Sequence, residues 1–250
     1  MFKLIPLDDL RILADKQMKP YQQVPILECG EPLVPIVGSF VVETPHPYQV
    51  LGATYHSSPY YLRQSVLDKL QNAQTVLQKS HPNWQILIFD AYRPIAVQQF
   101  MVDYTFAQVV QAQGLIADNL TALQQDRVWQ QVYQIWAVPS LDPRTPPPHS
   151  TGGAVDITLV DDSGETVNMG SPIDELSPRS HPDYFAHSTN REEQQYHAHR
   201  QLLKDVMYLA GFMRHPGEWW HFCYGDQMYA WLKQQENPDI VPVAKYGCVE

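Results

Sequence analysis

The chain is poor in cysteine and in positive charge, and both shortages exclude classes of protein. Among its 250 residues only three are cysteines, Cys29, Cys223 and Cys248. An odd, scattered set of thiols makes neither a disulfide framework nor a Cys-x-x-Cys metal site, and it favours a reducing cytoplasm. Lysine and arginine number 17 against 27 aspartates and glutamates, which gives a net charge of −10. An acidic chain without a basic run is poorly suited to binding nucleic acid or an anionic membrane.

Long apolar segments are also absent. No run approaches the roughly 18 residues of a transmembrane helix. The opening MFKLIPLDDLRIL is broken by Pro6, Asp8 and Asp9, and it lacks the apolar core and small-residue cleavage site of a secretory signal. These features predict a cytoplasmic protein with no membrane partner. What the chain does contain, 44% apolar and 18% charged residues, is typical of a globular protein long enough to bury a sizeable core.

Apolar periodicity and turn residues predict one α+β domain over residues 1–250, in which helices flank an antiparallel central sheet. Helices and strands do not alternate regularly, which argues against a doubly wound parallel sheet. Residues 1–50 contain seven prolines, so we expect an irregular arm with short edge strands around 36–42.

The expected elements follow from local patterns. Thr189-Asn-Arg-Glu192 has the spacing of a capping box and opens one of the helices. The predicted helices cover 60–79, 94–113, 121–136, 189–211 and 225–235. The predicted strands cover 84–89, 154–160, 165–169, 212–214 and 219–224, and an irregular tail covers 237–250.

The first chemical motif is His149-Ser-Thr-Gly-Gly-Ala-Val-Asp156. Five prolines within 139–148 make a stiff loop that presents His149, and a Gly-Gly turn leads into the strand. Asp156 stands in this otherwise aliphatic strand, and a buried charge must be paired or coordinate a metal. Zinc accepts histidine nitrogen and aspartate oxygen together. The spacing fits equally well a surface aspartate beside a loop histidine.

The second motif is Glu218-Trp-Trp-His221. Residues three apart on a regular strand face opposite sides, so both side chains reach one site only if Glu218 lies in the turn before the strand. A carboxylate beside an activated water can act as a general base. Taken alone, the motif is also compatible with an aromatic core strand that carries a satisfied histidine. His46 and His215 have no convincing partner in the sequence.

The third motif is Asp90-Ala-Tyr-Arg93-Pro94. An arginine at a strand end, just ahead of a helix, can point a fixed fork of donors into a cleft. The alternative is a structural ion pair between Arg93 and Asp90.

Together the motifs contain every part of a metallohydrolase. Catalytic zinc keeps three protein ligands and an open fourth position, a set that His149, Asp156 and His221 would complete. Glu218 would supply the base, and Arg93 a donor for a developing oxyanion.

These motifs, with Met169-Gly-Ser-Pro-Ile-Asp174-Glu, resemble in content and order the zinc D-alanyl-D-alanine dipeptidases of the vancomycin-resistance type, within a wider group of zinc D,D-peptidases and murein peptidases. The resemblance spans 90–221. It implies an α+β domain with one zinc ion on its sheet, held by His149, Asp156 and His221. It further implies that Glu218 is the catalytic base and acid, that Arg93 stabilises the tetrahedral intermediate, and that Asp174 holds the ammonium of a free D-dipeptide.

One position departs from the family pattern. Two residues before the metal histidine the family usually has serine, and here Pro147 occupies that position. The change bears on substrate identity more than on catalysis. A D,D-carboxypeptidase or murein endopeptidase acting on longer peptides is therefore the alternative enzyme. The missing export signal favours the dipeptidase, since murein lies outside the membrane. The presence of Glu218 argues against a zinc-binding module without turnover.

Overall fold

A computed structural model describes residues 19–36, 38 and 40–249. The beginning of the predicted proline-rich arm, two positions within the predicted edge strands, and residue 250 of the predicted tail lie outside these ranges. None of the helices in the described ranges combines the length and apolar character needed to span a bilayer.

A five-stranded sheet forms the centre of the fold, in the order β2-β4-β5-β7-β6. Its strands are β2 (Val41–Val42), β4 (Gln85–Asp90), β5 (Ala154–Val160), β6 (Met213–Arg214) and β7 (His221–Cys223). A separate antiparallel pair joins β1 (Leu33–Pro35) to β3 (Tyr61–Arg63). The predicted α+β class is confirmed.

The sequence predicts an antiparallel central sheet. The structure corrects this prediction at one edge, where β2 runs parallel to β4. The other pairings in this sheet are antiparallel. Between β2 and β4 the chain passes through α2 (Pro47–Val50), β3 and α3 (Gln64–Ser80). A helical crossover of this kind is how a chain returns to lay down a parallel neighbour, so the long connection accounts for the direction of β2.

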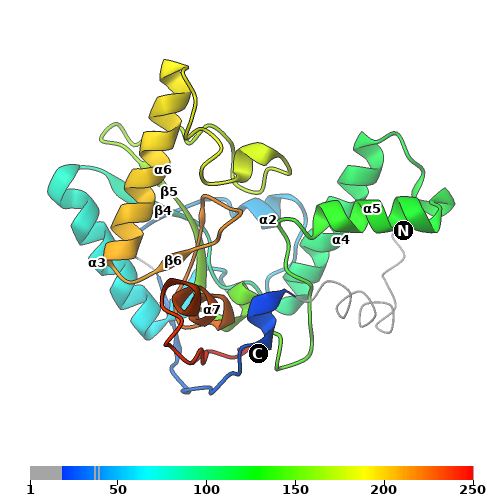
Figure 1. Ribbon diagram of the computed structural model, residues 1–250, viewed down its shortest axis with the longest axis horizontal. Coiled ribbons are helices and arrows are strands. Elements are labelled where there is room, and N and C mark those ends of the chain that lie inside the picture. Colours follow the sequence, from blue (N-terminus) through cyan, green and yellow to red (C-terminus); the bar gives the residue numbers. More distant parts are fainter. Residues whose placement is uncertain (1–18, 37, 39, 250) are drawn as a thin grey trace.

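Helices α3 and α6 (Arg191–Leu209) contact each other and cover one face of the sheet (Figure 1). Alternate residues of β5, Val155, Ile157 and Leu159, join their apolar side chains in the main core. Because successive residues of a strand face opposite sides, Asp156 points away from these helices. The face of the sheet that carries Asp156 is therefore free to form a site.

A second helical unit consists of α4 (Ile95–Ala112) and α5 (Ala122–Val132), which have their own apolar cluster (Figure 1). The last helix, α7 (Gln227–Glu236), packs on the short 3-10 helix η1 (Pro20–Gln23). Three further 3-10 helices are η2 (Ala117–Asn119), η3 (Pro148–Thr151) and η4 (Pro178–Ser180).

Four local predictions are corrected. The helix predicted over 60–79 begins only at Gln64, because residues 61–63 form strand β3. Residues 165–169 form no strand and keep a single bridge between Val160 and Thr166. Helix α6 is capped by Asn190 rather than Thr189, because the Asn190 side chain accepts the backbone N–H groups of residues 192 and 193. Helix α5 ends at Val132, so Trp136 is buried in the following loop rather than on the helix.

Arg200 ties helix α6 to the loop over 169–181. This side chain is fully buried, and its guanidinium donates to the carbonyls of Met169 and His181 and to the Ser171 hydroxyl. Burial lowers the pKa of Arg200 to about 10. The same loop carries Asp174, so this anchor links the helical layer to the candidate site.

Arg200→Met should lower the free energy of unfolding by about 2–4 kcal/mol, because it removes three hydrogen bonds of a fully buried guanidinium, including the one to the carbonyl of the buried Met169. Urea denaturation measures the effect. Arg191→Met, at the exposed first turn of the same helix, is the matched control and should change stability by less than about 0.5 kcal/mol. Equal stabilities of the two variants would contradict the anchoring role.

Candidate metal centre and active site

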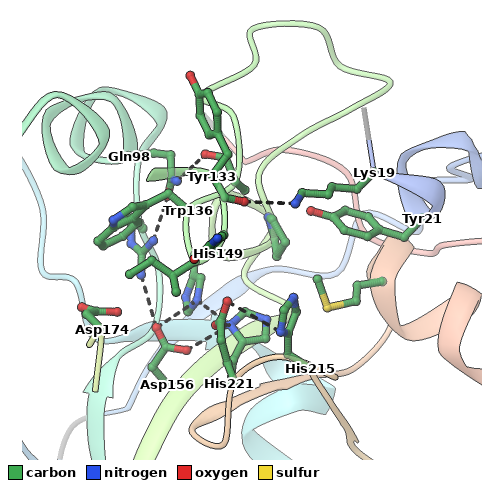
Figure 2. A pocket seen from close by; sticks show the side chains of 17 residues that line it. Lys19, Tyr21, Gln98, Tyr133, Trp136, His149, Asp156, Asp174, His215 and His221 are labelled. Atoms are coloured by element: carbon green, nitrogen blue, oxygen red, sulfur yellow. Dashed lines mark hydrogen bonds and ion pairs between the residues drawn. The ribbon is translucent and has the colours of Figure 1, made fainter. Parts of the chain in front are cut away.

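Three buried side chains from three elements meet on the open face of the sheet: His149 from η3, Asp156 from β5 and His221 from β7 (Figure 2). His149 Nε2 lies 3.2 Å from Asp156 Oδ2 and 3.1 Å from His221 Nδ1. His221 Nδ1 lies 3.0 Å from Asp156 Oδ1. The sequence predicts these three residues as metal ligands, and the structure brings their donor atoms together.

The backbone dictates this meeting. Asp156 and His221 are directly paired residues of β5 and β7, so their side chains leave the sheet on the same face. His149 is fixed by a contact of its Nδ1 with the Ala91 carbonyl at 2.8 Å. Gly152, with φ +70°, turns the chain from η3 into β5. The predicted loop, Gly-Gly turn and strand are thus all present.

The donor set fits a metal cation. With its Nδ1–H donated to the Ala91 carbonyl, a neutral His149 turns an Nε2 lone pair toward a carboxylate oxygen. The lone pair of His149 Nε2 and the Asp156 Oδ2 atom, 3.2 Å apart, repel each other unless a positive charge such as a metal ion lies beside them. A tetrahedral zinc site with bonds of roughly 2.0–2.1 Å would separate its donors by roughly 3.3 Å. His221 meets the other donors through Nδ1, although this leaves its buried Nε2 without a hydrogen-bond partner among the described residues.

Glu218 lies in the turn that precedes β7. This is the position that the sequence predicts for it if it shares one site with His221. Its carboxylate lies 4.0 Å from His221 Nδ1 and 3.6 Å from His215 Nδ1. Burial raises the pKa of Glu218 well above its usual value, and the carboxylates of Asp156 and Asp174 add to this. A carboxyl group of raised pKa beside a metal centre can both accept and return a proton.

Arg93 forms the structural ion pair that its motif allows, and it also lines the pocket. Its Nε and Nη2 bind Asp90 Oδ2 at 2.9 and 2.7 Å, so the structural pair exists. The same guanidinium lines the pocket and lies 3.3 Å from Asp156 Oδ2. The rings of Tyr48 and Trp136 pack against it, with their centroids 4.9 and 5.0 Å from its Cζ atom and 5.8 Å from each other.

A β-bulge brings Asp90 into this network. The pairing of β4 with β5 shifts between Ile88 and Asp90, so Asp90 faces Asp156 instead of following the regular register. The bulge turns the Asp90 side chain to the site face of the sheet. There it also meets His46 Nε2 at 3.1 Å, which corrects the expectation that His46 has no partner.

Asp174 lies at one end of the pocket (Figure 2). It adopts φ +63°, and its carboxylate accepts the Tyr48 hydroxyl at 2.9 Å. Burial, followed by repulsion from Asp156, raises its pKa to about 7. An anionic group held at this place is suited to a cationic part of a ligand.

Part of the pocket wall is not predicted from the sequence. Lys19 and Tyr21 come from the segment around η1, Tyr133 and Trp136 from the loop after α5, and His215 from β6–β7 (Figure 2). No local signal marks them, because they meet the motifs only through contacts between segments far apart in the sequence. His215 thus gains a place beside Glu218 that its own neighbours do not reveal.

Comparison with known proteins places this site in a family. The model for peptidase M15, D-ala-D-ala dipeptidase, matches residues 42–238. A D-alanyl-D-alanine dipeptidase of Synechocystis sp. is 53% identical over 94% of this chain and 99% of its own length. One of Escherichia coli is 29% identical over 68% of this chain and 69% of its own.

Among solved structures, a zinc-bound mutant of the vancomycin-resistance D,D-pentapeptidase VanY is 18% identical over 74% of this chain and 84% of that chain, with a TM-score of 0.42. This likeness is too weak to bear on the site. The family model covers far more than half of the chain, and the Synechocystis relative matches it almost end to end. The resemblance inferred from the motifs is therefore confirmed, and the chain belongs to the peptidase M15 family of D-alanyl-D-alanine dipeptidases.

Proposed function

We propose that this chain is a zinc-dependent dipeptidase that hydrolyses D-alanyl-D-alanine or a similar free D-dipeptide. The observation that carries the proposal is the buried trio His149, Asp156 and His221 with the carboxylate of Glu218 beside it. The D-alanyl-D-alanine dipeptidase of Synechocystis, 53% identical, supports the choice of substrate.

His149, Asp156 and His221 would hold one zinc ion, which mixed histidine and carboxylate ligation suits. When bound, zinc supplies a Lewis acid and lowers the pKa of a water molecule toward about 7. The protein contributes buried donor atoms that lie 3.0–3.2 Å from one another.

Glu218 moves the proton. Among the described residues its carboxylate accepts no hydrogen bond, and the only ring nitrogens within 4.0 Å belong to His215 and His221. It takes the proton from the water that attacks the peptide carbonyl and returns it to the nitrogen of the leaving amino acid. Its raised pKa suits both halves of this transfer.

Arg93 stabilises the negative charge that develops on the carbonyl oxygen. Asp90 and Gln98 fix its guanidinium, and the Tyr48 and Trp136 rings pack against it, so it needs little reorganisation during the reaction. Asp174 would receive the substrate ammonium with the Tyr48 hydroxyl already bound to one of its oxygens.

The location is also part of the proposal. A cytoplasmic enzyme would act on free dipeptides, since murein lies outside the membrane. The acidic pI and the scarcity of cysteine, three in 250 residues, are compatible with that compartment.

Release of D-alanine from D-alanyl-D-alanine tests the reaction. Purified, zinc-loaded wild type should release it, and Glu218→Gln should be slower by about 10²–10⁴-fold, because no other described group lies ready to carry the proton. Glu165→Gln, on an exposed turn, is the charge-matched control and should keep the wild-type rate. Zinc content is measured for each protein, and a metal-loaded Glu218→Gln enzyme of full activity would rule out this base.

Metal removal should act on both rate and stability. Chelation should abolish D-alanine release, and added zinc should restore it. Because the metal binds the folded state, its loss should also lower stability, by about 4 kcal/mol for zinc at a thousand times its Kd. Thermal unfolding of the two forms measures this, and a metal-free protein with unchanged unfolding and unchanged activity would exclude the centre.

Blocking the substrate ammonium separates a dipeptidase from the longer-peptide alternatives. Wild type should cleave D-alanyl-D-alanine about 10–100-fold more efficiently than its N-acetyl derivative, because acetylation removes the partner of Asp174. Asp174→Asn should narrow that ratio, and asparagine tolerates the left-handed backbone at this position. Preference for the acetylated substrate would instead indicate a carboxypeptidase or an endopeptidase.

A further inference from the structure

Two basic side chains line the pocket, and their surroundings differ. Arg93 forms ion pairs with Asp90 and Asp156. Lys19 forms no ion pair with any residue that the structure describes, and its Nζ donates to a neutral partner, the Tyr133 carbonyl, at 3.0 Å. Lys19 is therefore the pocket cation whose charge the protein leaves uncompensated at contact distance.

Lys19 is held in place by the scaffold. Its backbone N–H donates to Gln22 Oε1 at 2.8 Å, which closes the start of η1. Gln227 of α7 then donates to the carbonyls of Gln22 and Val24 at 3.2 and 2.6 Å, and to that of Arg144 at 2.9 Å. Because Gln227 is buried, these bonds fix the segment that carries Lys19 against the body of the protein.

The charges of the pocket are arranged along its length. Figure 2 shows Asp174 at one end and Lys19 at the opposite end, with the trio His149, Asp156 and His221 between their positions in the view. The Glu218 carboxylate is affected by both charges: the charge of Asp174 raises its pKa, and that of Lys19 lowers it. A free dipeptide is a zwitterion, with its ammonium and carboxylate at opposite ends of the scissile bond.

We propose that Lys19 binds the C-terminal carboxylate of the substrate and thereby restricts the enzyme to peptides with a free carboxyl end. This inference rests on the proposed function and extends it to the second end of the substrate. The lysine ammonium carries three hydrogens, so it can keep its bond to the Tyr133 carbonyl and still donate to a carboxylate.

A further observation supports this role. Partial burial lowers the pKa of Lys19, while the Glu218 carboxylate raises it. An ammonium that has already lost part of its water gives up less hydration when it binds an anion.

The experiment compares D-alanyl-D-alanine with D-alanyl-D-alaninamide, which lacks the terminal charge. Wild type should prefer the acid in kcat/KM by about 10–100-fold. Lys19→Met should raise the KM for the acid by a similar factor, change kcat less, and leave the amide almost unaffected, so that the preference collapses. Lys19→Arg should restore most of it. Lys79→Met, at an exposed position near the end of α3, is the charge-matched control and should behave as wild type.

Calorimetry measures how the acid and the amide bind to zinc-loaded Glu218→Gln, with and without Lys19→Met. These measurements separate the role of Lys19 from the proposed function. A Lys19→Met enzyme that still prefers the acid as wild type does would overturn the role of Lys19 and leave the dipeptidase intact. Equal efficiency of wild type on acid and amide would do the same. If wild type neither cleaves nor binds either compound, the proposed function fails and the role of Lys19 with it.

Discussion

The carboxylate of Asp156 is the constraint on which the rest of the site depends. It sits on a strand whose seven residues are all buried, in the middle of the sheet. A charge in that position costs several kcal/mol unless it is compensated. His149, His221 and Arg93 surround it, and these contacts outweigh the effect of burial and lower the pKa of Asp156. An apolar residue at this position would avoid the cost of burying a charge. The presence of the Asp156 carboxylate therefore indicates a binding role for its charge.

The partners of Asp156 come from different elements, and the sheet brings them together. His221 is its direct neighbour in the ladder of β5 and β7. Arg93 follows β4, where a bulge places Asp90 opposite Asp156 and provides the carboxylate that holds the guanidinium. His149 arrives on η3, just before the strand. The site is therefore complete only when β4, β5 and β7 are paired, which makes the fold a precondition of metal binding rather than its product.

The sequence predicts those parts of the site that local patterns encode. The aliphatic run with Asp156 defines β5 at its observed bounds, and the turn before His221 positions Glu218 as expected. Contacts between distant segments are not encoded locally. The bulge in β4, the parallel direction of β2 and the wall containing Lys19 all depend on residues that meet only after folding. The end of α5 fails for the same reason: Trp136 stacks on Arg93, and this contact outweighs the helical periodicity that would extend the helix.

A small substrate places a particular demand on such a site. A dipeptide offers little surface beyond its scissile bond and two charged ends, so binding energy must come from those ends. Charges act most strongly where water is excluded, and the residues that line this pocket are largely buried. Three carboxylates, Asp156, Asp174 and Glu218, would repel one another in such surroundings, and the raised pKa values of Asp174 and Glu218 record that repulsion together with burial. A cation at the trio and the ammonium of a substrate at Asp174 would relieve it, so the electrostatics that destabilise the empty pocket favour its ligands.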